Sequence, residues 1–286
     1  MKRILITGAG SFIGSSVERW LAVYPDRYSV DTIDTINEKW READFSKYDV
    51  VFHVAGIAHV DPKPEMAPLY YKVNRDLAIA IATHAKNVGV RQFIFMSSMI
   101  VYHASKSLKS TIINAETKPN PNDFYGDSKL QAEIGLKQLE SLDFKVALLR
   151  PCMIYGNGGK GNFQRLARMA SRVPIFPEWH NKRSMLYIDN LCEFVRQVID
   201  RGLGGTFHPQ NREYADTVAI VRFFAKKAGK KVFFSKFFNP AVWLGSFILA
   251  PLSKMFADQY YTSDLSTYDF EYQIVSLGDS LKRIDI

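Results

Sequence analysis

The stretch RILITGAGSFIG, residues 3–14, decides the fold of this chain. It begins with a short apolar run, passes through Gly8, Gly10 and Gly14, and leads into the amphipathic segment 15–24, SSVERWLAVY. A strand, a glycine turn and a helix in this order place backbone N–H groups and a helix N-terminus against a pyrophosphate. Glycine suits the turn because a β-carbon would block it or the approach of the phosphate. The glycine cluster by itself would also fit a tight turn that binds no ligand.

A second predicted strand, YSVDTID at 28–34, ends at Asp34, 20 residues after Gly14. An acidic residue at about that distance holds the adenosine ribose hydroxyls in dinucleotide-binding folds. It would also repel a 2′-phosphate, so we expect NAD rather than NADP. Asp31 is the rival residue, and Asp34 is preferred because it closes the strand. A loop aspartate without a ligand stays as the alternative.

Strands and helices alternate through the first 200 residues. The segments 49–56, 92–98 and 145–150 have the composition of strands, and 65–87, 162–172, 189–201 and a stretch from 124 have that of helices. This order predicts an α/β fold, a Rossmann-like doubly wound parallel sheet covered on both faces. Ligands bind at the carboxyl ends of such strands. Those ends hold Gly8–Gly14, Asp34, Ala55–Gly56, Ser97–Ser98 and Arg150–Pro151.

The composition is that of an ordinary globular protein, with 286 residues, 47% of them hydrophobic and 23% charged. Without repeats or a linker, we expect one compact unit with two lobes. The NAD-binding core should comprise 1–150 plus about 184–208, and the substrate lobe 151–183 plus 209–286. The start of the chain enters a strand rather than a signal peptide. No segment reaches the roughly 20 apolar residues that span a bilayer.

The net charge of +8 includes a lysine cluster at 226–231. No nucleic-acid-binding motif accompanies it, so anionic small molecules or an anionic membrane surface explain the charge at least as well. Cys152 and Cys192 stand far apart, and the six histidines show no zinc spacing. A reduced, cytoplasmic protein without a metal is expected.

Two tyrosines stand four residues before a lysine. Tyr102 follows a strand and precedes residues without helical periodicity, so Lys106 has no fixed relation to it. Tyr125 instead opens a helix-forming segment, which puts Lys129 on the same helix face. A nearby ammonium lowers the pKa of a phenol, and Ser98 can supply a hydroxyl to the same reacting oxygen. Ser98, Tyr125 and Lys129 therefore predict alcohol oxidation or ketone reduction with a redox cofactor.

The chain resembles the extended short-chain dehydrogenase/reductases of the nucleotide-sugar epimerase/dehydratase family. The matching motifs, in family order, are TGAGSFIG at 7–14, HVAG at 53–56, VN at 73–74, SSMIVY at 97–102, YGDSK at 125–129, LRPCMIYG at 149–156 and RSMLYIDNL at 183–191. The chain departs from the family at Ser11 and His103, where glycines are usual. Its short span between Asp34 and the HVAG strand predicts that a helix or strand of the relatives is missing.

The resemblance implies roles for individual residues. Tyr125 and Lys129 are the implied catalytic pair, Ser98 assists them, and Lys129 also holds the nicotinamide ribose. Asn162 and Arg183 are implied to bind the substrate, the arginine through its diphosphate, which a guanidinium pairs well. The implied cofactor-binding residues are Gly8, Gly10, Ser11, Phe12, Ile13, Gly14, Asp34, Asp44, Ala55, Gly56, Asn74, Ser97, Lys129, Pro151 and Met153.

The resemblance also narrows the reaction. Dehydratases of the family carry an acidic pair after the Ser98 position, whereas Met99 and Ile100 here cannot move a proton. We expect 4-epimerisation of a UDP-hexose or UDP-N-acetylhexosamine through a 4-keto intermediate, in surface-polysaccharide biosynthesis. Reduction of a UDP-4-keto-6-deoxy-N-acetyl sugar stays open, as does a non-catalytic NAD-sensing protein.

Apolar helices near 74–87 and 125–141 predict a homodimer.

The segment NPAVWLGSFILAPLSKMFA at 239–257 is strongly apolar. One expectation is a helix pair that packs in the substrate lobe, because large apolar segments usually lie in the core. The other is an interfacial helix that, with the lysine cluster, contacts the inner face of the cell membrane. In that case the resemblance admits a substrate sugar linked to polyprenyl diphosphate.

Overall fold

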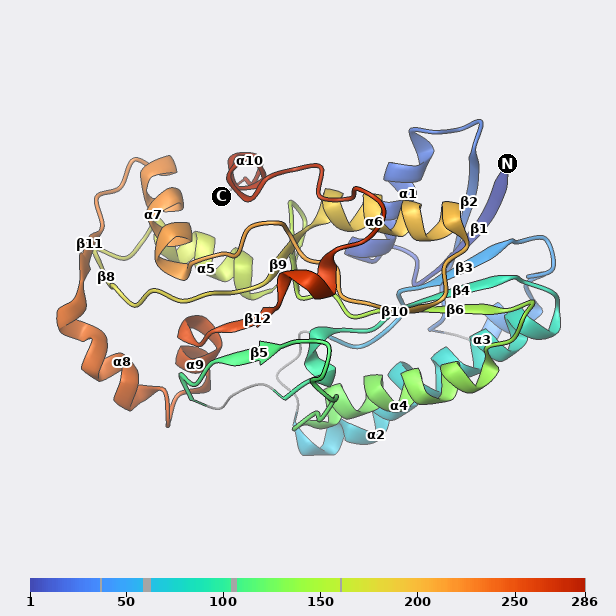
Figure 1. Ribbon diagram of the computed structural model, residues 1–286, viewed down its shortest axis with the longest axis horizontal. Helices are drawn as coiled ribbons and strands as arrows, with labels where there is room; N and C mark the ends of the chain where they lie inside the picture. The colour runs from blue at the N-terminus through green and yellow to red at the C-terminus, as the bar shows by residue number, and fades with distance from the viewer. Residues whose placement is uncertain (37, 59–62, 104–106, 160, 286) are drawn as a thin grey trace.

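The computed structural model describes residues 1–36, 38–58, 63–103, 107–159 and 161–285. Its main element is a six-stranded sheet, all parallel, in the order β10-β6-β4-β3-β1-β2, which occupies one end of the elongated molecule in Figure 1. The strands are β1 (Lys2–Thr7), β2 (Tyr28–Ile33), β3 (Val50–His53), β4 (Gln92–Met96), β6 (Lys145–Leu149) and β10 (Gly205–Phe207). The predicted α/β class with a parallel sheet is confirmed.

Helices cover both faces of this sheet. In Figure 1, α1 (Phe12–Ala22) and α6 (Ile188–Arg201) lie together on one face, and α3 (Leu77–Asn87) and α4 (Phe124–Leu139) on the other. Successive side chains of a strand point to opposite faces, so Ile4 and Ile6 join the core under α1 and α6 while Leu5 joins the core under α3 and α4. Burial on both faces explains the continuous apolar runs of these strands.

The strand order reverses between β1 and β3. The chain runs from β1 outward to β2, which forms the edge of the sheet, and then returns to β3 on the other side of β1. Between β2 and β3 the regular structure of the described residues is one 3₁₀ turn, η1 (Glu38–Glu42), in line with the short span predicted there. Ligands of open α/β sheets bind at such a reversal, beyond the carboxyl ends of the strands.

The remaining elements either lie near the sheet or form a second lobe. Near the sheet lie η2 (Pro64–Met66), α2 (Ala67–Tyr70), the π-helical η3 (Tyr71–Asp76) and η4 (Met99–Val101). Parallel strand pairs form between β5 (Thr111–Ile113) and β12 (Gln259–Tyr261), β7 (Met153–Tyr155) and β9 (Met185–Tyr187), and β8 (Ile175–Pro177) and β11 (Phe233–Ser235). The other helical elements are α5 (Asn162–Ala170), α7 (Thr217–Lys227), η5 (Lys236–Phe238), α8 (Asn239–Gly245), α9 (Ala250–Phe256), η6 (Ser263–Ser266) and α10 (Leu277–Lys282). The division into core and lobe at the expected boundaries stays a prediction.

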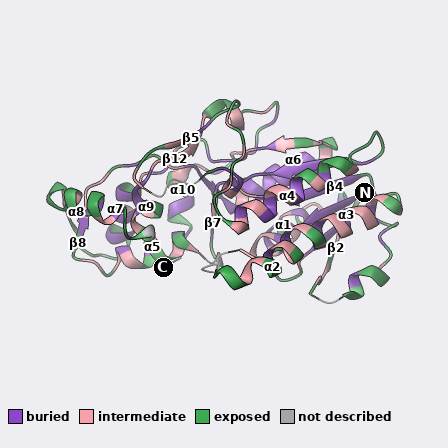
Figure 2. Cartoon of the chain, turned by 90° about the horizontal axis from the view of Figure 1, so that it is seen from below, coloured by how far each residue is buried: buried purple, intermediate pink, exposed green. Residues whose placement is uncertain are grey.

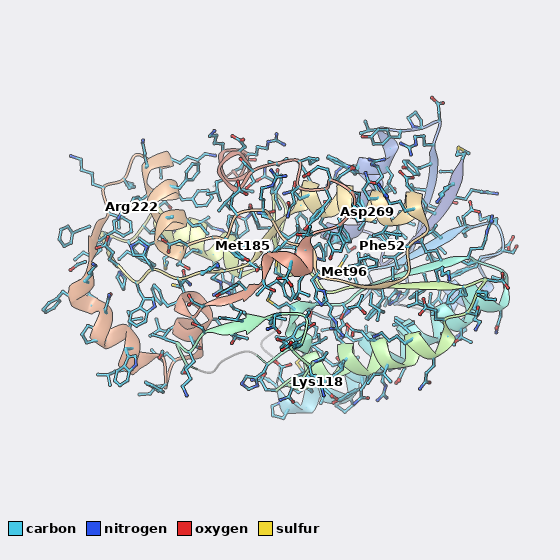
Figure 3. All side chains as sticks on the ribbon, viewed as in Figure 1. Phe52, Met96, Lys118, Met185, Arg222 and Asp269 are labelled. Carbon is cyan, nitrogen blue, oxygen red and sulfur yellow. The ribbon has the colours of Figure 1, made fainter. Side chains whose placement is uncertain are left out.

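Buried apolar side chains cover both faces of the sheet. Figure 3 shows Phe52 and Met96 there and Arg222 near the opposite end, and both apolar residues belong to the buried core. Figure 2 shows the sheet as largely buried and α8 as largely exposed. Cys152 and Cys192 are buried and free. None of the helices in the described part of the chain combines the length and the hydropathy of a membrane span.

Candidate active site

The glycine turn joins β1 to α1 where the strand order reverses. Gly8 has φ +101° and Gly10 φ +72°, in the left-handed region that favours glycine. A β-carbon at Gly8 would lie 2.8 Å from the backbone nitrogen of Ala55, so the turn and the end of β3 approach too closely for a larger residue. The structure therefore brings the predicted cofactor residues Gly8 and Ala55 together, with Gly56 following.

The N-terminus of α1 suits an anion. Ser11, at the position of a family glycine, caps the helix by accepting a 3.1 Å hydrogen bond from the N–H of Gly14. The first turn, with Phe12 and Ile13, contains no acidic residue that would oppose the positive end of the helix dipole. A β-carbon at Gly159 would lie 3.3 Å from Cε1 of Phe12, so the glycine-rich loop after β7 flanks this turn. The turn and the helix fit the pyrophosphate of a dinucleotide.

The two candidate ribose aspartates have different surroundings. Asp31 accepts a 2.7 Å hydrogen bond from the hydroxyl of Tyr48 and lies 3.9 Å from Lys47 Nζ. Asp34 is exposed directly after β2, and its Oδ1 accepts a 2.9 Å hydrogen bond from the N–H of Ile36. The N–H of Gly8 donates to the carbonyl of the residue before Asp34, Ile33, so the glycine turn and Asp34 are neighbours. The geometry favours Asp34 for a ribose.

Three further predicted cofactor residues lie at loop or strand starts. Asp44 is exposed, and hydrogen bonds from Ser46 lower the pKa of its carboxyl. The carbonyl of Pro151 accepts a 2.9 Å hydrogen bond from the N–H of Met99, which ties the end of β6 to the turn after β4. Met153 begins β7 and is half-buried. The contact of Pro151 with Met99 places it near Ser98, whereas Asp44 makes its hydrogen bonds to Ser46 of its own loop and is influenced by the charges of Lys47 and Arg3.

The N-terminus of α4 meets the turn that follows β4. A β-carbon at Gly126 would lie 2.6 Å from the carbonyl oxygen of Ile100, so glycine is required for this approach. Tyr125 accordingly reaches Ser98, and their side chains hydrogen-bond. The ring of Tyr70 packs edge-on against Tyr125, with centroids 5.7 Å apart. The structure thus brings the predicted serine and tyrosine together.

The Tyr125 phenol has a raised pKa. Burial raises it to about 12 because the phenolate loses hydration, and the hydrogen bond from Ser98 counteracts this in part. The expectation that Lys129 makes the pKa of this phenol low is wrong for the free protein. Desolvation is the dominant effect, so Tyr125 is neutral at physiological pH.

Lys129 extends from α4 to the reversal point of the sheet. Its Nζ donates a 3.0 Å hydrogen bond to the carbonyl of Met96 and lies 4.7 Å from the ring centroid of Phe95. A β-carbon at Gly56 would lie 3.1 Å from this Nζ, so the ammonium reaches the predicted cofactor crevice. Burial lowers the pKa of Lys129 to about 8, and the carboxylate of Glu133 partly offsets that effect.

Asn74 ties the loop after β3 to α4. Its Oδ1 accepts a 2.9 Å hydrogen bond from the N–H of Ile57, and its Nδ2 donates to the carbonyl of Ile57 and to Oγ of Ser128, both at 3.2 Å. Asn74 lies in the π-helical η3, a type of distortion frequent at functional sites. Its side chain positions the loop of Gly56 against Lys129.

Glu133, one turn beyond Lys129, was missing from the predicted site. It is 1% exposed and pairs with the guanidinium of Arg150, whose Nε lies 3.0 Å from Oε1 and whose Nη2 lies 2.5 Å from Oε2. Ser97, a predicted cofactor residue, also donates its hydroxyl to Glu133. The repeat of Tyr125, Lys129 and Glu133 at intervals of four was the sequence signal that could have identified this helix face.

Tyr102, the other tyrosine before a lysine, belongs to the same buried network. Its backbone is extended, with φ −92° and ψ 156°, directly after η4. Its hydroxyl accepts a 2.7 Å hydrogen bond from Arg150 and lies 2.9 Å from Nε2 of His208. Burial lowers the pKa of His208 to about 4, so this imidazole is neutral at physiological pH. Lys106 lies outside the described residues.

The predicted substrate residues lie in the second lobe. Asn162 is exposed at the start of α5, as expected. Arg183 is half-buried, donates from Nη1 to the carbonyl of Lys254, and makes no ion pair with a carboxylate among the residues that the structure describes. Burial lowers the pKa of this guanidinium, whereas Cys152, just past β6, and the carboxylate of Asp258, which makes no ion pair with it, act in the opposite direction. A partly desolvated arginine without a carboxylate partner suits an anionic ligand such as a diphosphate.

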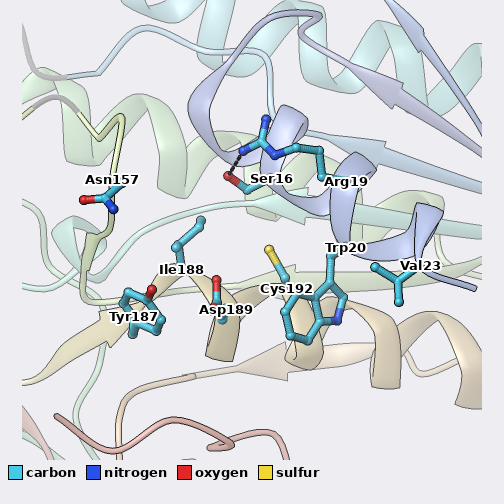
Figure 4. A pocket seen from close by; sticks show the side chains of 9 residues that line it. All are labelled: Ser16, Arg19, Trp20, Val23, Asn157, Tyr187, Ile188, Asp189 and Cys192. Atoms are coloured by element: carbon cyan, nitrogen blue, oxygen red, sulfur yellow. Dashed lines mark hydrogen bonds between the residues drawn. The ribbon is translucent and has the colours of Figure 1, made fainter. Parts of the chain in front are cut away.

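Two pockets lie away from this crevice. The pocket in Figure 4, of about 260 Å³, lies between α1 and α6 and includes Arg19, Trp20, Asp189 and Cys192 in its lining. Another, of about 330 Å³, borders the network of Tyr102, Glu133, Arg150 and His208. Neither is lined by the glycine turn, Tyr125 or Lys129. We place the candidate active site at the reversal point of the sheet because Tyr125, Ser98, Lys129 and the glycine turn meet there.

Comparisons with known proteins agree with this geometry. Residues 4–208 match the model of the NAD dependent epimerase/dehydratase family. A UDP-glucose 4-epimerase of Vibrio cholerae is 33% identical over 223 residues, covering 70% of this chain and 67% of the relative. The N-acetyl-alpha-D-glucosaminyl-diphospho-ditrans,octacis-undecaprenol 4-epimerase of Escherichia coli O157:H7 is 24% identical over 290 residues, covering 93% of this chain and 85% of the relative.

Solved structures share the fold. The UDP-glucuronic acid 4-epimerase of Bacillus cereus in complex with NAD superposes with a TM-score of 0.75 at 20% identity, covering 98% of this chain and 96% of that one. At this identity the match shows the fold alone. Of the solved chains with this fold, this epimerase is in complex with NAD, and a dTDP-4-dehydrorhamnose reductase of Bacillus anthracis is in complex with NADP. A nicotinamide dinucleotide is the typical cofactor of the family whose model matches this chain.

Proposed function

The chain belongs to the NAD-dependent epimerase/dehydratase family, and we propose that it inverts C4 of a nucleotide-activated sugar such as a UDP-hexose or UDP-N-acetylhexosamine. The observation that carries this proposal is the contact of Tyr125 with Ser98 at the N-terminus of α4, one turn from a buried Lys129. Similarity to a UDP-glucose 4-epimerase over 70% of the chain supports it. Dehydration is disfavoured because the side chains of Met99 and Ile100 cannot transfer protons.

The side chains divide the work as follows. Tyr125 takes the proton of the C4 hydroxyl during oxidation and returns it when the ketone is reduced on the opposite face. Ser98 hydrogen-bonds the reacting oxygen, and Tyr70 excludes water from one edge of the phenol. When bound, NAD supplies the hydride acceptor and a positive ring that favours the phenolate. Lys129, one turn along the same helix, would add a second positive charge that favours the phenolate during the reaction.

The proposal takes NAD rather than NADP as the cofactor. The exposed carboxylate of Asp34 beside the glycine turn can accept hydrogen bonds from ribose hydroxyls and would repel a 2′-phosphate. Asp31 is less suited, because Tyr48 already donates to its carboxylate.

Two measurements on the purified enzyme test the proposal. The nucleotide released on denaturation is identified, and native enzyme is incubated with UDP-glucose or UDP-N-acetylglucosamine without added cofactor while NMR follows the configuration at C4. We expect released NAD and inversion at C4. Reduction of a UDP-4-keto sugar by added NADH or NADPH, without inversion of either UDP-sugar, would replace the epimerase by a 4-ketoreductase.

A second candidate substrate carries its sugar on a polyprenyl diphosphate. The E. coli O157:H7 relative, which by its name acts on an undecaprenol-linked sugar, matches 93% of this chain. In addition, Arg183 contacts the carbonyl of Lys254 in α9, so a diphosphate at this arginine would lie next to the apolar helix pair α8–α9. The same NMR assay with polyprenyl-diphosphate N-acetylglucosamine in detergent tests this substrate, and inversion of UDP-sugars alone would exclude it.

We also propose a homodimer in which α3 and α4 pair with their counterparts. Ile134 is 53% exposed on α4, next to Gly135 against which Ile79 of α3 packs, so an apolar side chain stays uncovered where the two helices meet. Light scattering at micromolar concentration should give twice the mass of the chain. A monomer under those conditions would contradict this arrangement.

A further inference from the structure

The helix pair α8–α9 presents a large apolar surface to solvent. In Figures 1 and 2, α8 lies at the end of the molecule opposite the six-stranded sheet and is largely exposed. Six exposed large apolar residues define what we call the α8 patch: Phe237, Trp243, Leu244, Phe247, Ile248 and Leu249. Phe237 is 83% exposed and Ile248 84%, so these side chains have little cover from the chain itself. Single exposed apolar residues are common, whereas a contiguous group marks an interaction site.

Packing against α9 determines which side of α8 faces outward. Val242 and Ser246 are buried, and a β-carbon at Gly245 would lie 2.7 Å from Cδ1 of Leu252. These residues form the inner side of the helix. The rings of Trp243 and Phe247 pack edge-on, with centroids 5.3 Å apart, on the outer side. The expectation that this segment packs in the core holds for the inner side of the pair alone.

The charged side chains of the segment that carries the patch all have one sign. Segment 217–257 contains Arg222, six lysines and no aspartate or glutamate. The six lysines, all exposed, are Lys226, Lys227, Lys230, Lys231, Lys236 and Lys254. Lys227 donates to two backbone carbonyls, and Arg222 lies 3.4 Å from Glu178, an acidic residue that packs beside η5. The other five lysines make no ion pair among the described residues, so the surface is strongly positive.

We propose that the α8 patch and these lysines dock the enzyme on an anionic lipid bilayer. Aromatic and aliphatic side chains on a short helix can enter the boundary between headgroups and acyl chains, while lysine stems extend to anionic headgroups. A second copy of the chain is a poorer occupant, because a symmetric contact would oppose two sets of six lysines without an acidic partner in the segment.

Docking through this surface has a consequence for the substrate. Arg183 contacts α9 at Lys254, so the candidate diphosphate site and the α8 patch lie on the same helix pair. A bilayer under the patch would bring a membrane-bound sugar donor to that arginine. This consequence rests on the proposed function, whereas docking itself does not.

Co-sedimentation of the full-length enzyme with vesicles tests the docking. Vesicles of equal parts phosphatidylglycerol and phosphatidylethanolamine should bind the enzyme at low salt, with loss of binding as salt is added, and phosphatidylcholine vesicles should bind little. The double variant Trp243→Ser, Phe247→Ser should bind at least about tenfold more weakly. Leu142→Ser is the matched control, because Leu142 is 91% exposed but lies in the loop after α4.

A second set of variants tests the contribution of the lysines to vesicle binding. Lys230→Glu with Lys231→Glu should weaken binding at low salt and reduce its salt dependence, whereas Lys118→Glu with Lys145→Glu, at exposed sites outside the segment, should have a smaller effect. A blue shift of tryptophan fluorescence on adding anionic vesicles should occur in the wild type and be absent from Trp243→Phe, since a tryptophan that leaves water changes its emission.

Several outcomes would overturn the docking. One is no co-sedimentation with anionic vesicles at low salt, and another is unchanged binding of the Trp243→Ser, Phe247→Ser variant. A third is a smaller mass of that variant than of the wild type in light scattering, which would assign the patch to a contact between copies. Assays of UDP-sugar inversion without vesicles separate the two proposals. Inversion without vesicle binding refutes docking alone, and vesicle binding without any sugar turnover refutes the proposed function alone.

Discussion

The helices α4 and α8 differ in how their side chains are covered: α4 buries charged side chains, whereas α8 exposes apolar ones. Along α4, Lys129 and Glu133 are charged and buried, and each has a partner in the same chain, the carbonyl of Met96 and the guanidinium of Arg150. Along α8, large apolar side chains are exposed and lack such cover. A buried charge costs free energy unless partners hold it, so the α4 region is constrained by its own chain. An exposed apolar patch gains stabilisation only from something outside the chain.

The largest expected effect is on stability, from Glu133→Gln. The change leaves the buried guanidinium of Arg150 without its counter-charge, which should lower the free energy of unfolding by about 3–5 kcal/mol. Urea denaturation followed by circular dichroism measures this. Glu116→Gln, at an exposed position, is the control. A loss below about 1 kcal/mol would mean that the pair contributes little more than a surface salt bridge.

The next largest effect is on catalysis, from Tyr125→Phe. The ring and its contact with Tyr70 are kept, so the unfolding midpoint should stay close to that of the wild type. Removal of the proton donor and acceptor should lower kcat at least about a hundredfold, or about 2.7 kcal/mol of transition-state stabilisation. Tyr102→Phe is the comparison, because that hydroxyl serves Arg150 and His208 and should affect stability more than rate. Wild-type turnover of Tyr125→Phe would end the assignment of this residue.

The pH dependence of kcat/KM should show the titration of the buried Lys129 ammonium. Burial lowers the pKa of Lys129 to about 8, so the protonated form predominates below that pH and is lost as the pH rises through it. We expect kcat/KM to fall above about pH 8, as Lys129 loses the charge that stabilises the phenolate. In Glu133→Gln this fall should begin at lower pH, because the carboxylate that raises the pKa is gone. A profile that stays flat to pH 10, near the ordinary lysine pKa of about 10.4, would contradict the burial of this charge.

The smallest effect should come from the other region. Ile248→Ser, at a position 84% exposed, should change the free energy of unfolding by less than about 0.5 kcal/mol. Ile81→Ala, in the core under α3 and α4, should cost about 2–5 kcal/mol in the same assay. A large loss for Ile248→Ser would show that the α8 patch is covered within the chain or by a second copy, and the contrast between the two regions would disappear.

Local patterns in the sequence predicted much of the fold and part of the candidate site. The glycine turn with its strand and helix, the strand ending at Asp34, and the helix shared by Tyr125 and Lys129 all depend on residues close in sequence. The role of Glu133 was not predicted although it continues the same helix face, because its partner Arg150 follows a strand that is distant in sequence. The hydroxyl of Ser97 donates to Glu133, and its predicted contact with the cofactor stays a prediction.

The sequence by itself therefore determined the alternation of strands and helices, the place of the glycine turn and the spacing of tyrosine and lysine, since these follow from short-range sterics and periodicity. Only the tertiary structure decided that Tyr125 has a raised pKa, that Glu133 and Arg150 form a buried pair, and that one side of α8 faces solvent. The physical reason is that hydration and charge pairing depend on which distant segments pack against a residue, and neighbours in the sequence do not contain that information.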